Sequence, residues 1–339
     1  MSKTNSRTRA FETVNNKGFK SNRSRQKLVV AIFVVIILIL LAFATLIIGQ
    51  IVNKVGPRPT LPGPSGSNTI PKDAGDVKIG SLLFIGEKYQ YNFPTDVSNI
   101  VNLYQYQNNS ENSGKTHING YCTYSLTMDR ITLDKTTLEA FNQMILDYCG
   151  TLDLSGASKN AASNLNVAWG NYDDVDEYLS DIASEAYGAE YYDHALGTTL
   201  TLRRNSDSAP ITEQILKDEY TWIYENAHKY GFIIRFPDEC KDHTGFDSSK
   251  RVHLRYVGIE HATYIHQNEI CFEEYLELVR NYGVDNPLTF TADNGNTYEV
   301  YYVTYSGNPT SVPVPKDNPY TISGDNMNGF IVTVENTIE

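Results

Sequence analysis

The stretch Tyr220-Thr-Trp-Ile-Tyr-Glu-Asn-Ala-His-Lys-Tyr-Gly-Phe-Ile-Ile-Arg-Phe-Pro237 has the pattern of a helix that turns directly into a strand. Thr212 is placed to cap this helical segment, and Gly231 supplies the residue at which a helix can stop. Apart from Arg235, residues 232–236 are β-branched or aromatic, so we predict a strand there. His253-Leu-Arg-Tyr-Val257 should be its paired strand.

Other periodic segments surround this unit. We predict strands at residues 80–85 and 195–202, and helices at residues 138–148, 174–187, 260–267 and 272–282. After Gly283 short strands alternate with Gly, Asn and Pro, at residues 288–291, 298–303 and 330–334. Residues 284–339 are therefore expected to form a small β-rich module, which is either a separate domain or an extension of the main sheet.

The N-terminal region predicts a membrane anchor. Residues 28–53, from Leu28 to Asn53, contain no charged side chain, and at ~1.5 Å per residue such a helix crosses a ~30 Å hydrocarbon core. A cleaved signal peptide is the alternative, but the apolar run is long and no small-residue cleavage site follows it. Residues 1–27 carry eight basic side chains and one acidic one. This bias places a cytoplasmic tail before a single-pass helix, with the C-terminal domain outside the cell.

The chain beyond the anchor is acidic. The whole protein has a formal charge of −12 although its first 27 residues are strongly basic, so the exported part is poorly suited to bind nucleic acid. Residues 54–76 are rich in Pro, Gly and Ser and predict an extended linker. The main domain is expected over residues 77–283.

Four cysteines lie on the predicted outer side of the membrane, where disulfides persist. Three connectivities are possible. We favour Cys122 with Cys149 and Cys240 with Cys271, because each pair flanks one local unit.

Two further runs carry candidate chemistry. The first is Tyr192-Asp-His194-Ala-Leu-Gly197-Thr-Thr-Leu-Thr201, and the second is Lys250-Arg-Val-His253. Together with Asn226-Ala-His-Lys-Tyr-Gly-Phe232 and His253-Leu-Arg-Tyr-Val-Gly258, they resemble the VanY-type D-alanyl-D-alanine carboxypeptidases. The resemblance covers roughly residues 80–282. It implies an α+β fold, with a central antiparallel sheet and flanking helices.

The resemblance also implies a zinc site, which this sequence matches only in part. The family motifs are Ser-x-His-x-x-Gly-x-Ala-x-Asp and Glu-x-x-His, so His194 and His253 match two zinc ligands. Thr201 stands at the aspartate ligand, and Lys250 at the general-base glutamate. The family's Ser-Gly-Tyr-Arg, whose arginine holds the substrate carboxylate, is matched to residues 155–158, which puts Ser158 at the arginine.

These replacements predict weak zinc binding or none. A catalytic zinc needs three protein ligands and a water, and a threonine hydroxyl is a poor substitute for a carboxylate. A lysine charge ~5 Å from the dication would be repelled by several kcal/mol at an effective dielectric of ~20. Ionised lysine also has no lone pair with which to accept a proton from water. Asp193 or Asp247 is a possible substitute acid, and the Lys250 ammonium could instead fill the cation position between His194 and His253.

Three functional hypotheses follow. The first is a catalytically degenerate ectodomain that binds peptidoglycan or a cell-wall protein, or regulates an active relative. The second is an active zinc D,D-carboxypeptidase that cleaves peptidoglycan stem peptides. The third is an interaction scaffold that uses the module at residues 284–339.

Overall fold

The computed structural model describes residues 67–85, 89, 98–170, 193–244 and 248–336. Residues Gly63–Glu339 form one compact unit, separate from Met1–Pro62. No helix in the described ranges is long and apolar enough to cross a membrane. The predicted anchor at residues 28–53 and the predicted helix at residues 174–187 lie outside these ranges, as do Tyr192 and Asp247.

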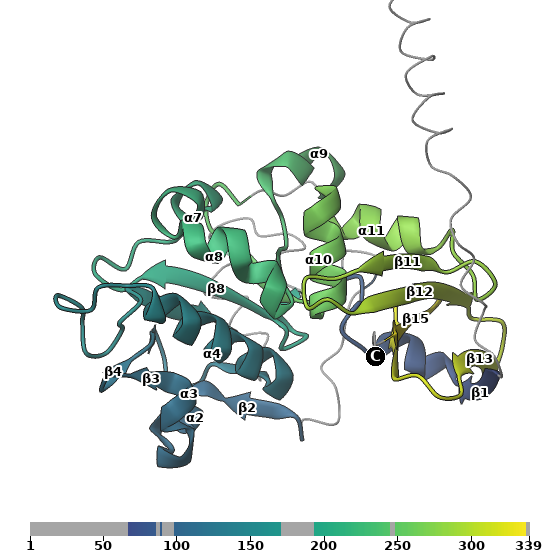
Figure 1. The fold of residues 1–339 in the computed structure, drawn as a ribbon, viewed down its shortest axis with the longest axis horizontal. Helices are drawn as coiled ribbons and strands as arrows, with labels where there is room; N and C mark the ends of the chain where they lie inside the picture. Colours follow the sequence, from purple (N-terminus) through teal and green to yellow (C-terminus); the bar gives the residue numbers. More distant parts are fainter. Residues whose placement is uncertain (1–66, 86–88, 90–97, 171–192, 245–247, 337–339) are drawn as a thin grey trace, which may run out of the picture. The chain divides into compact units, whose positions relative to one another are not determined.

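A five-stranded sheet carries the central part of the fold (Figure 1). Its strands, in spatial order, are β5 (Ser125–Leu126), β7 (Leu165–Trp169), β8 (Thr199–Arg204), β10 (His253–Tyr256) and β9 (Phe232–Ile234). Only the pair β5 and β7 is parallel, and the other three pairings are antiparallel. The predicted α+β class with a mainly antiparallel central sheet is confirmed.

The two faces of this sheet differ because side chains alternate along a strand. Leu200 and Leu202 of β8, with Leu254 of β10, enter the largest apolar core. Thr199 and Thr201 of β8 lie on the opposite face, beside His253 and Arg255 of β10. One face is therefore apolar, and the other presents buried polar groups.

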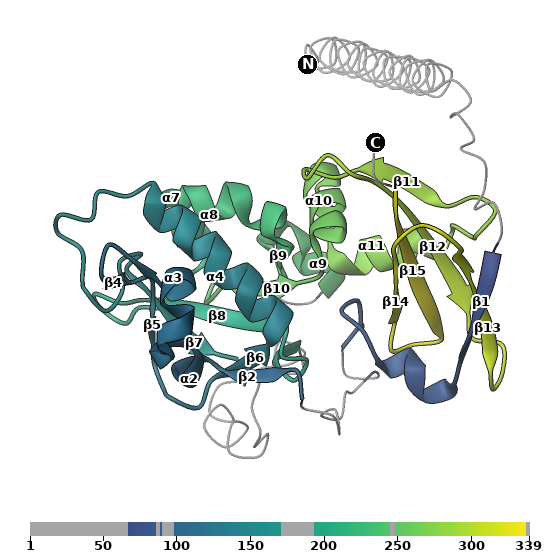
Figure 2. The ribbon, with the colours of Figure 1, turned by 60° about the horizontal axis from the view of Figure 1, so that its bottom comes forward.

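Helices cover the apolar face. The helix α4 (Lys135–Gly150) begins at Asp134, whose carboxylate accepts hydrogen bonds from two backbone N–H groups of the first turn. Its residues Phe141 and Ile145 are fully buried in the same core as Leu200. α4 contacts α8 (Thr221–Asn226), and Figures 1 and 2 show the two helices side by side over β8. The predicted helix ending near Gly150 is confirmed.

The segment that leads into β9 follows the predicted course. Thr212 caps α7 (Glu213–Glu219) by accepting a hydrogen bond from the N–H of Ile215. After α8, the 3-10 helix η3 (Ala227–Tyr230) ends at Gly231, which has φ of 85°. Helices η4 (Asp238–Cys240) and α9 (Lys241–Thr244) follow β9, and α10 (Ile259–Asn268) and α11 (Phe272–Val279) follow β10.

Shorter elements precede α4. They are β2 (Ile100–Asn102), α2 (Leu103–Asn108), η2 (Ser110–Asn112), α3 (Ser113–Thr116), β3 (His117–Ile118), β4 (Tyr121–Cys122) and β6 (Thr132–Asp134). β2 pairs with β6, and β3 with β4.

The C-terminal strands form their own sheet, as Figure 2 shows. Its order is β11 (Leu288–Thr291), β12 (Thr297–Thr304), β15 (Gly329–Asn336) and β14 (Tyr320–Gly324). It does not extend the main sheet, but it is not independent either. Leu288, Val300 and Ile331 share one apolar core with Val257 and Phe272 of the main domain.

Two predictions for residues before 86 differ from the structure where it describes them; residues 54–66 of the expected linker lie outside the described ranges. Within the expected linker, β1 (Ser67–Lys72) pairs with β13 (Thr310–Pro315), and η1 (Ala74–Lys78) follows it. Composition alone does not predict β1, because its partner strand β13 is more than 200 residues away in the sequence. Residues 80–85, predicted as a strand, are irregular. Leu82, Leu83 and Ile85 are buried, but the backbone is not paired in a sheet.

The predicted cysteine pairing is half right. Cys240 and Cys271 form a disulfide. Cys122 and Cys149 are free thiols: the Cys122 Sγ lies 3.1 Å from the backbone oxygen of Tyr124, and the Cys149 Sγ lies 3.8 Å from that of Thr123. Burial raises the pKa of Cys149 to about 12, so this thiol stays protonated at neutral pH.

Candidate functional site

The polar face of the sheet brings His194 and His253 together. The Nε2 of His194 lies 3.2 Å from the Nδ1 of His253, and both side chains are buried. The Nδ1 of His194 lies 3.1 Å from the backbone oxygen of Thr199, and that carbonyl requires Nδ1 to carry the proton. Burial, with His253 beside it, lowers the pKa of His194 to about 3, so the ring is neutral at physiological pH.

This spacing is compatible with two ligands of one zinc ion. A tetrahedral zinc with Zn–N bonds of about 2.0–2.1 Å separates its ligand nitrogens by about 3.3 Å. The hydrogen bond from His194 to a backbone carbonyl is also the usual support of a ligand histidine. The structure thus brings together the two histidines that the motifs pick out.

The third ligand position does not fit zinc. Thr201 lies directly opposite His253 in the pairing of β8 with β10, where the family resemblance places an aspartate. Its hydroxyl is buried and has no hydrogen-bond partner among the described residues. Within those residues, the only cluster of three potential ligands is Cys240, Cys271 and Glu274, and its cysteines are joined in a disulfide.

Lys250 does not take the place of the cation. Its side chain is exposed, whereas both histidines are buried. The two imidazole nitrogens are also too close to admit an ammonium group between them. The conjecture that Lys250 fills this position is therefore wrong. The half-buried Arg251 is the cation whose charge contributes to the lowered pKa of His194.

Asp193 cannot serve as a substitute ligand, because two arginines hold it. Its Oδ2 lies 2.8 Å from Nε of Arg235, and its Oδ1 lies 3.1 Å from Nη1 of Arg255. Arg235 also forms two hydrogen bonds with Glu273, of 2.7 and 3.1 Å. Asp193, Arg235 and Arg255 are almost completely buried. Burial lowers the pKa of Arg255 to about 10, and this arginine remains charged at neutral pH.

This ion network positions the histidine that follows Asp193. Arg255 donates two further hydrogen bonds, to the backbone oxygens of Ser81 and Leu83. The irregular segment at residues 80–85 is thereby attached to the same cluster. The sequence alone does not identify Asp193 and Glu273 as the partners of these arginines, because the paired residues lie on separate segments of the chain.

Ser158 lies in the segment between α4 and β7, outside the strands of the five-stranded sheet. It is exposed, and its hydroxyl accepts a hydrogen bond from the N–H of Asn160 in the loop before β7. The strand beside β8 is β7, where the residue opposite Thr201 is Trp169.

The comparisons with known proteins agree with this architecture. Residues 182–259 match the family model described as VanY, D-alanyl-D-alanine carboxypeptidase. A D-alanyl-D-alanine carboxypeptidase of Enterococcus faecium is 30% identical over 258 residues, which are 75% of this chain and 75% of that protein. The chain belongs to the VanY D-alanyl-D-alanine carboxypeptidase family. The matched region of this VanY-family protein includes both histidines, Thr201 and Lys250.

Solved structures extend the comparison of folds. The vancomycin resistance D,D-dipeptidase VanXYg, in complex with a D-Ala-D-Ala phosphinate analogue, has a TM-score of 0.62 and 19% identity. The alignment covers 80% of the VanY-family chain described here and 100% of VanXYg. A VanY from a VanB-type resistance cassette was solved in complex with Zn(II); it has 19% identity and a TM-score of 0.34, with 58% of this chain and 98% of that chain covered.

Proposed function

We propose that this protein binds peptidoglycan stem peptides at the cell wall without hydrolysing them. Membership of the VanY family supports the substrate class. The observation that carries the proposal is the position of Thr201, opposite His253 and in place of a carboxylate. His194, His253 and the buried Thr201 hydroxyl can still hydrogen-bond a peptide carboxylate or amide. Thr201 and Lys250, however, supply neither the carboxylate ligand nor the carboxylate base of the family motifs.

In this proposal the chain is an anchored ectodomain. The apolar residues 28–53 hold it in the cell membrane, the basic residues 1–27 remain in the cytoplasm, and the acidic C-terminal domain faces the wall. Its partner is peptidoglycan or a wall-associated protein, and nucleic acid is excluded by charge.

An active zinc D,D-carboxypeptidase is the second candidate. The spacing of the histidine nitrogens and the support of His194 by Thr199 favour it. It would need a third ligand from residues outside the described ranges, where Asp247 lies. If that aspartate completes a zinc site, the metal would polarise the peptide carbonyl and activate a water.

Metal analysis separates the two candidates. Residues 54–339, which include the whole compact unit, would be equilibrated with zinc and analysed for bound metal and for D-alanine release from a stem-peptide mimic. We expect well under one zinc per chain and no release, while the peptide still binds. The double variant Thr201→Asp, Lys250→Glu should gain zinc, because it restores a carboxylate beside the histidine pair.

The controls decide the interpretation. Stoichiometric zinc with turnover in the parent, lost in His253→Ala and in Asp247→Asn, would establish the active enzyme instead. Absence of any binding of the stem peptide to the parent would remove the binding function as well.

A further inference from the structure

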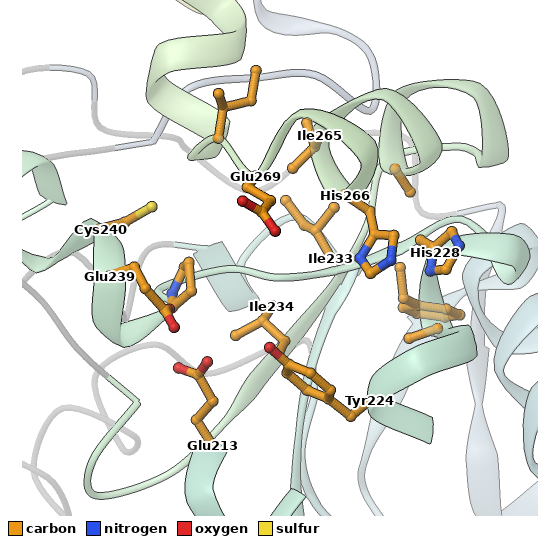
Figure 3. Close-up of a pocket in the computed structure, with 15 residues that line it drawn as sticks. Glu213, Tyr224, His228, Ile233, Ile234, Glu239, Cys240, Ile265, His266 and Glu269 are labelled. Atoms are coloured by element: carbon orange, nitrogen blue, oxygen red, sulfur yellow. The ribbon is translucent and has the colours of Figure 1, made fainter. Parts of the chain in front are cut away.

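A pocket opens at the outer edge of the central sheet, apart from the histidine pair. It has a volume of about 560 Å³ and lies along β9, between the α8–η3 segment and α10. The site histidines are on β10 and just before β8, and neither lines this pocket. Figure 3 shows Ile234 of β9 on its wall, with Tyr224 on one side and Ile265 and His266 on the other.

The backbone of β9 offers unused hydrogen-bonding groups to this pocket. β9 is the last strand of the sheet, and among the described residues it pairs only with β10. The N–H of Arg235 donates to His253, and the carbonyl of Gly231 accepts from Val257, so residues 231, 233 and 235 face β10. Because the groups alternate along an antiparallel strand, those of Phe232 and Ile234 face outward. An outward edge of this kind can pair with an extended peptide.

The pocket also carries an excess of negative charge. The carboxylates of Glu213, Glu239 and Glu269 point toward its centre (Figure 3). Lys217 lies 2.8 Å from Glu213 and 3.2 Å from Glu239, so one ammonium is shared by two carboxylates. Glu269 has no ion pair among the described residues, and no lysine or arginine lines the pocket.

His228, one of the two histidines of the pocket, does not neutralise this charge. His228 stacks on His266, with ring centroids 3.7 Å apart, and its Nε2 lies 2.6 Å from the carboxylate of Asp293. Burial, together with His266, lowers the pKa of His228, which favours its neutral form. Its Nδ1 is buried and has no hydrogen-bond partner within the described ranges.

We propose that the β9 edge is a second binding site, which takes an extended peptide carrying a basic side chain next to an apolar one. The peptide backbone would pair with the outward groups of Phe232 and Ile234. Its lysine or arginine would reach Glu269 and the shared Glu213–Glu239 pair, and its apolar side chain would pack on Ile234 and Ile265. This site does not depend on hydrolysis or on metal at His194 and His253.

A labelled peptide of seven residues with alternating valine and lysine would test the site by fluorescence anisotropy on residues 54–339. We expect saturable binding of one peptide per chain. Glu269→Gln should weaken it about fivefold, the size expected for a partly exposed ion pair. Glu277→Gln is the matched control, since it removes the same charge from an exposed glutamate of α11 outside the pocket, and it should leave affinity unchanged.

A second peptide separates backbone pairing from charge attraction to an acidic protein. N-methylation at alternate residues removes the N–H donors and keeps the charge, and should cost about tenfold in affinity. Equal weakening by Glu269→Gln and Glu277→Gln, or equal affinity for the methylated peptide, would overturn the proposal. Displacement of the probe by excess D-Ala-D-Ala would also overturn it, because the peptide would then occupy the histidine site. A failure of the stem-peptide to bind would contradict the proposed function, but it would not contradict the proposed site at the β9 edge.

Discussion

Asp193 is a fully buried carboxylate that is neutralised by two arginines rather than by a metal. Buried charges of this kind persist only when they are paired and hydrogen-bonded. The pairing has a consequence for the site, because Asp193 immediately precedes His194. The same residue therefore fixes the position of the histidine and is withdrawn from the set of possible zinc ligands.

Asp193→Asn should destabilise the protein by about 3–5 kcal/mol, since it leaves Arg235 and Arg255 buried with one negative charge fewer. Denaturant-induced unfolding of residues 54–339 would measure this change. Glu219→Gln is the control: that carboxylate is exposed and lies 3.4 Å from Arg204, so its loss should cost at most about 1 kcal/mol. Equal effects of the two substitutions would contradict the importance of the buried network.

At the scale of elements, the junction between η3 and β9 depends on Gly231. Its φ of 85° lies in the left-handed region, and an added Cβ would come within 2.6 Å of the Tyr256 ring and 3.1 Å of the Gly258 backbone. The turn brings β9 alongside β10 immediately after the helix. The turn at Gly231 therefore determines where the residues of β9 that line the pocket lie, and where Arg235 lies.

We expect Gly231→Ala to cost about 1–3 kcal/mol, from backbone strain and from contact with Tyr256. Gly295→Ala is a suitable control, because Gly295 has a φ of 84° but no atom near the added Cβ. Gly295→Ala should therefore lower the free energy of unfolding only through backbone strain. Thermal or denaturant unfolding should show a smaller loss of stability for it than for Gly231→Ala. A loss for Gly231→Ala no greater than that for Gly295→Ala would show that the close approach does not matter.

At the scale of the whole compact unit, the C-terminal sheet and the main domain share a core. His261 of α10 is fully buried at this junction: its Nδ1 lies 2.6 Å from the hydroxyl of Tyr275 in α11, and its Nε2 lies 3.1 Å from that of Thr333 in β15. Because the core is shared, deletion of residues 284–339 would expose apolar side chains of α11. The hypothesis of an independent scaffold module is therefore better tested by surface substitutions.

The stability of the unit should fall as the pH drops below about 6.5. Burial lowers the pKa of His261 from the ordinary value of 6.5, so the unfolded chain binds a proton that the folded chain resists. The contribution is fully present above pH 6.5 and is lost progressively toward the folded-state pKa. Each such histidine adds a slope of up to about 1.4 kcal/mol per pH unit.

His261→Gln keeps one hydrogen-bond donor and one acceptor but removes the titrating group. It should reduce the slope of the unfolding free energy by up to about 1.4 kcal/mol per pH unit. Unfolding would be measured between about pH 5 and pH 7, on both sides of the ordinary histidine pKa. An unaltered slope in His261→Gln would mean that this residue does not contribute to the acid sensitivity.

The sequence by itself determined the local features of this protein. Helix caps, strand alternation and the motif around His194 and His253 act over a few residues, and they identified the α+β class, the family and the histidine pair. Tertiary structure decided the rest, because strand pairing and charge pairing join residues far apart in the chain. It placed Asp193 between Arg235 and Arg255, paired β1 with β13, left Cys122 and Cys149 as free thiols, and left the outer edge of β9 unpaired among the described residues, beside a pocket.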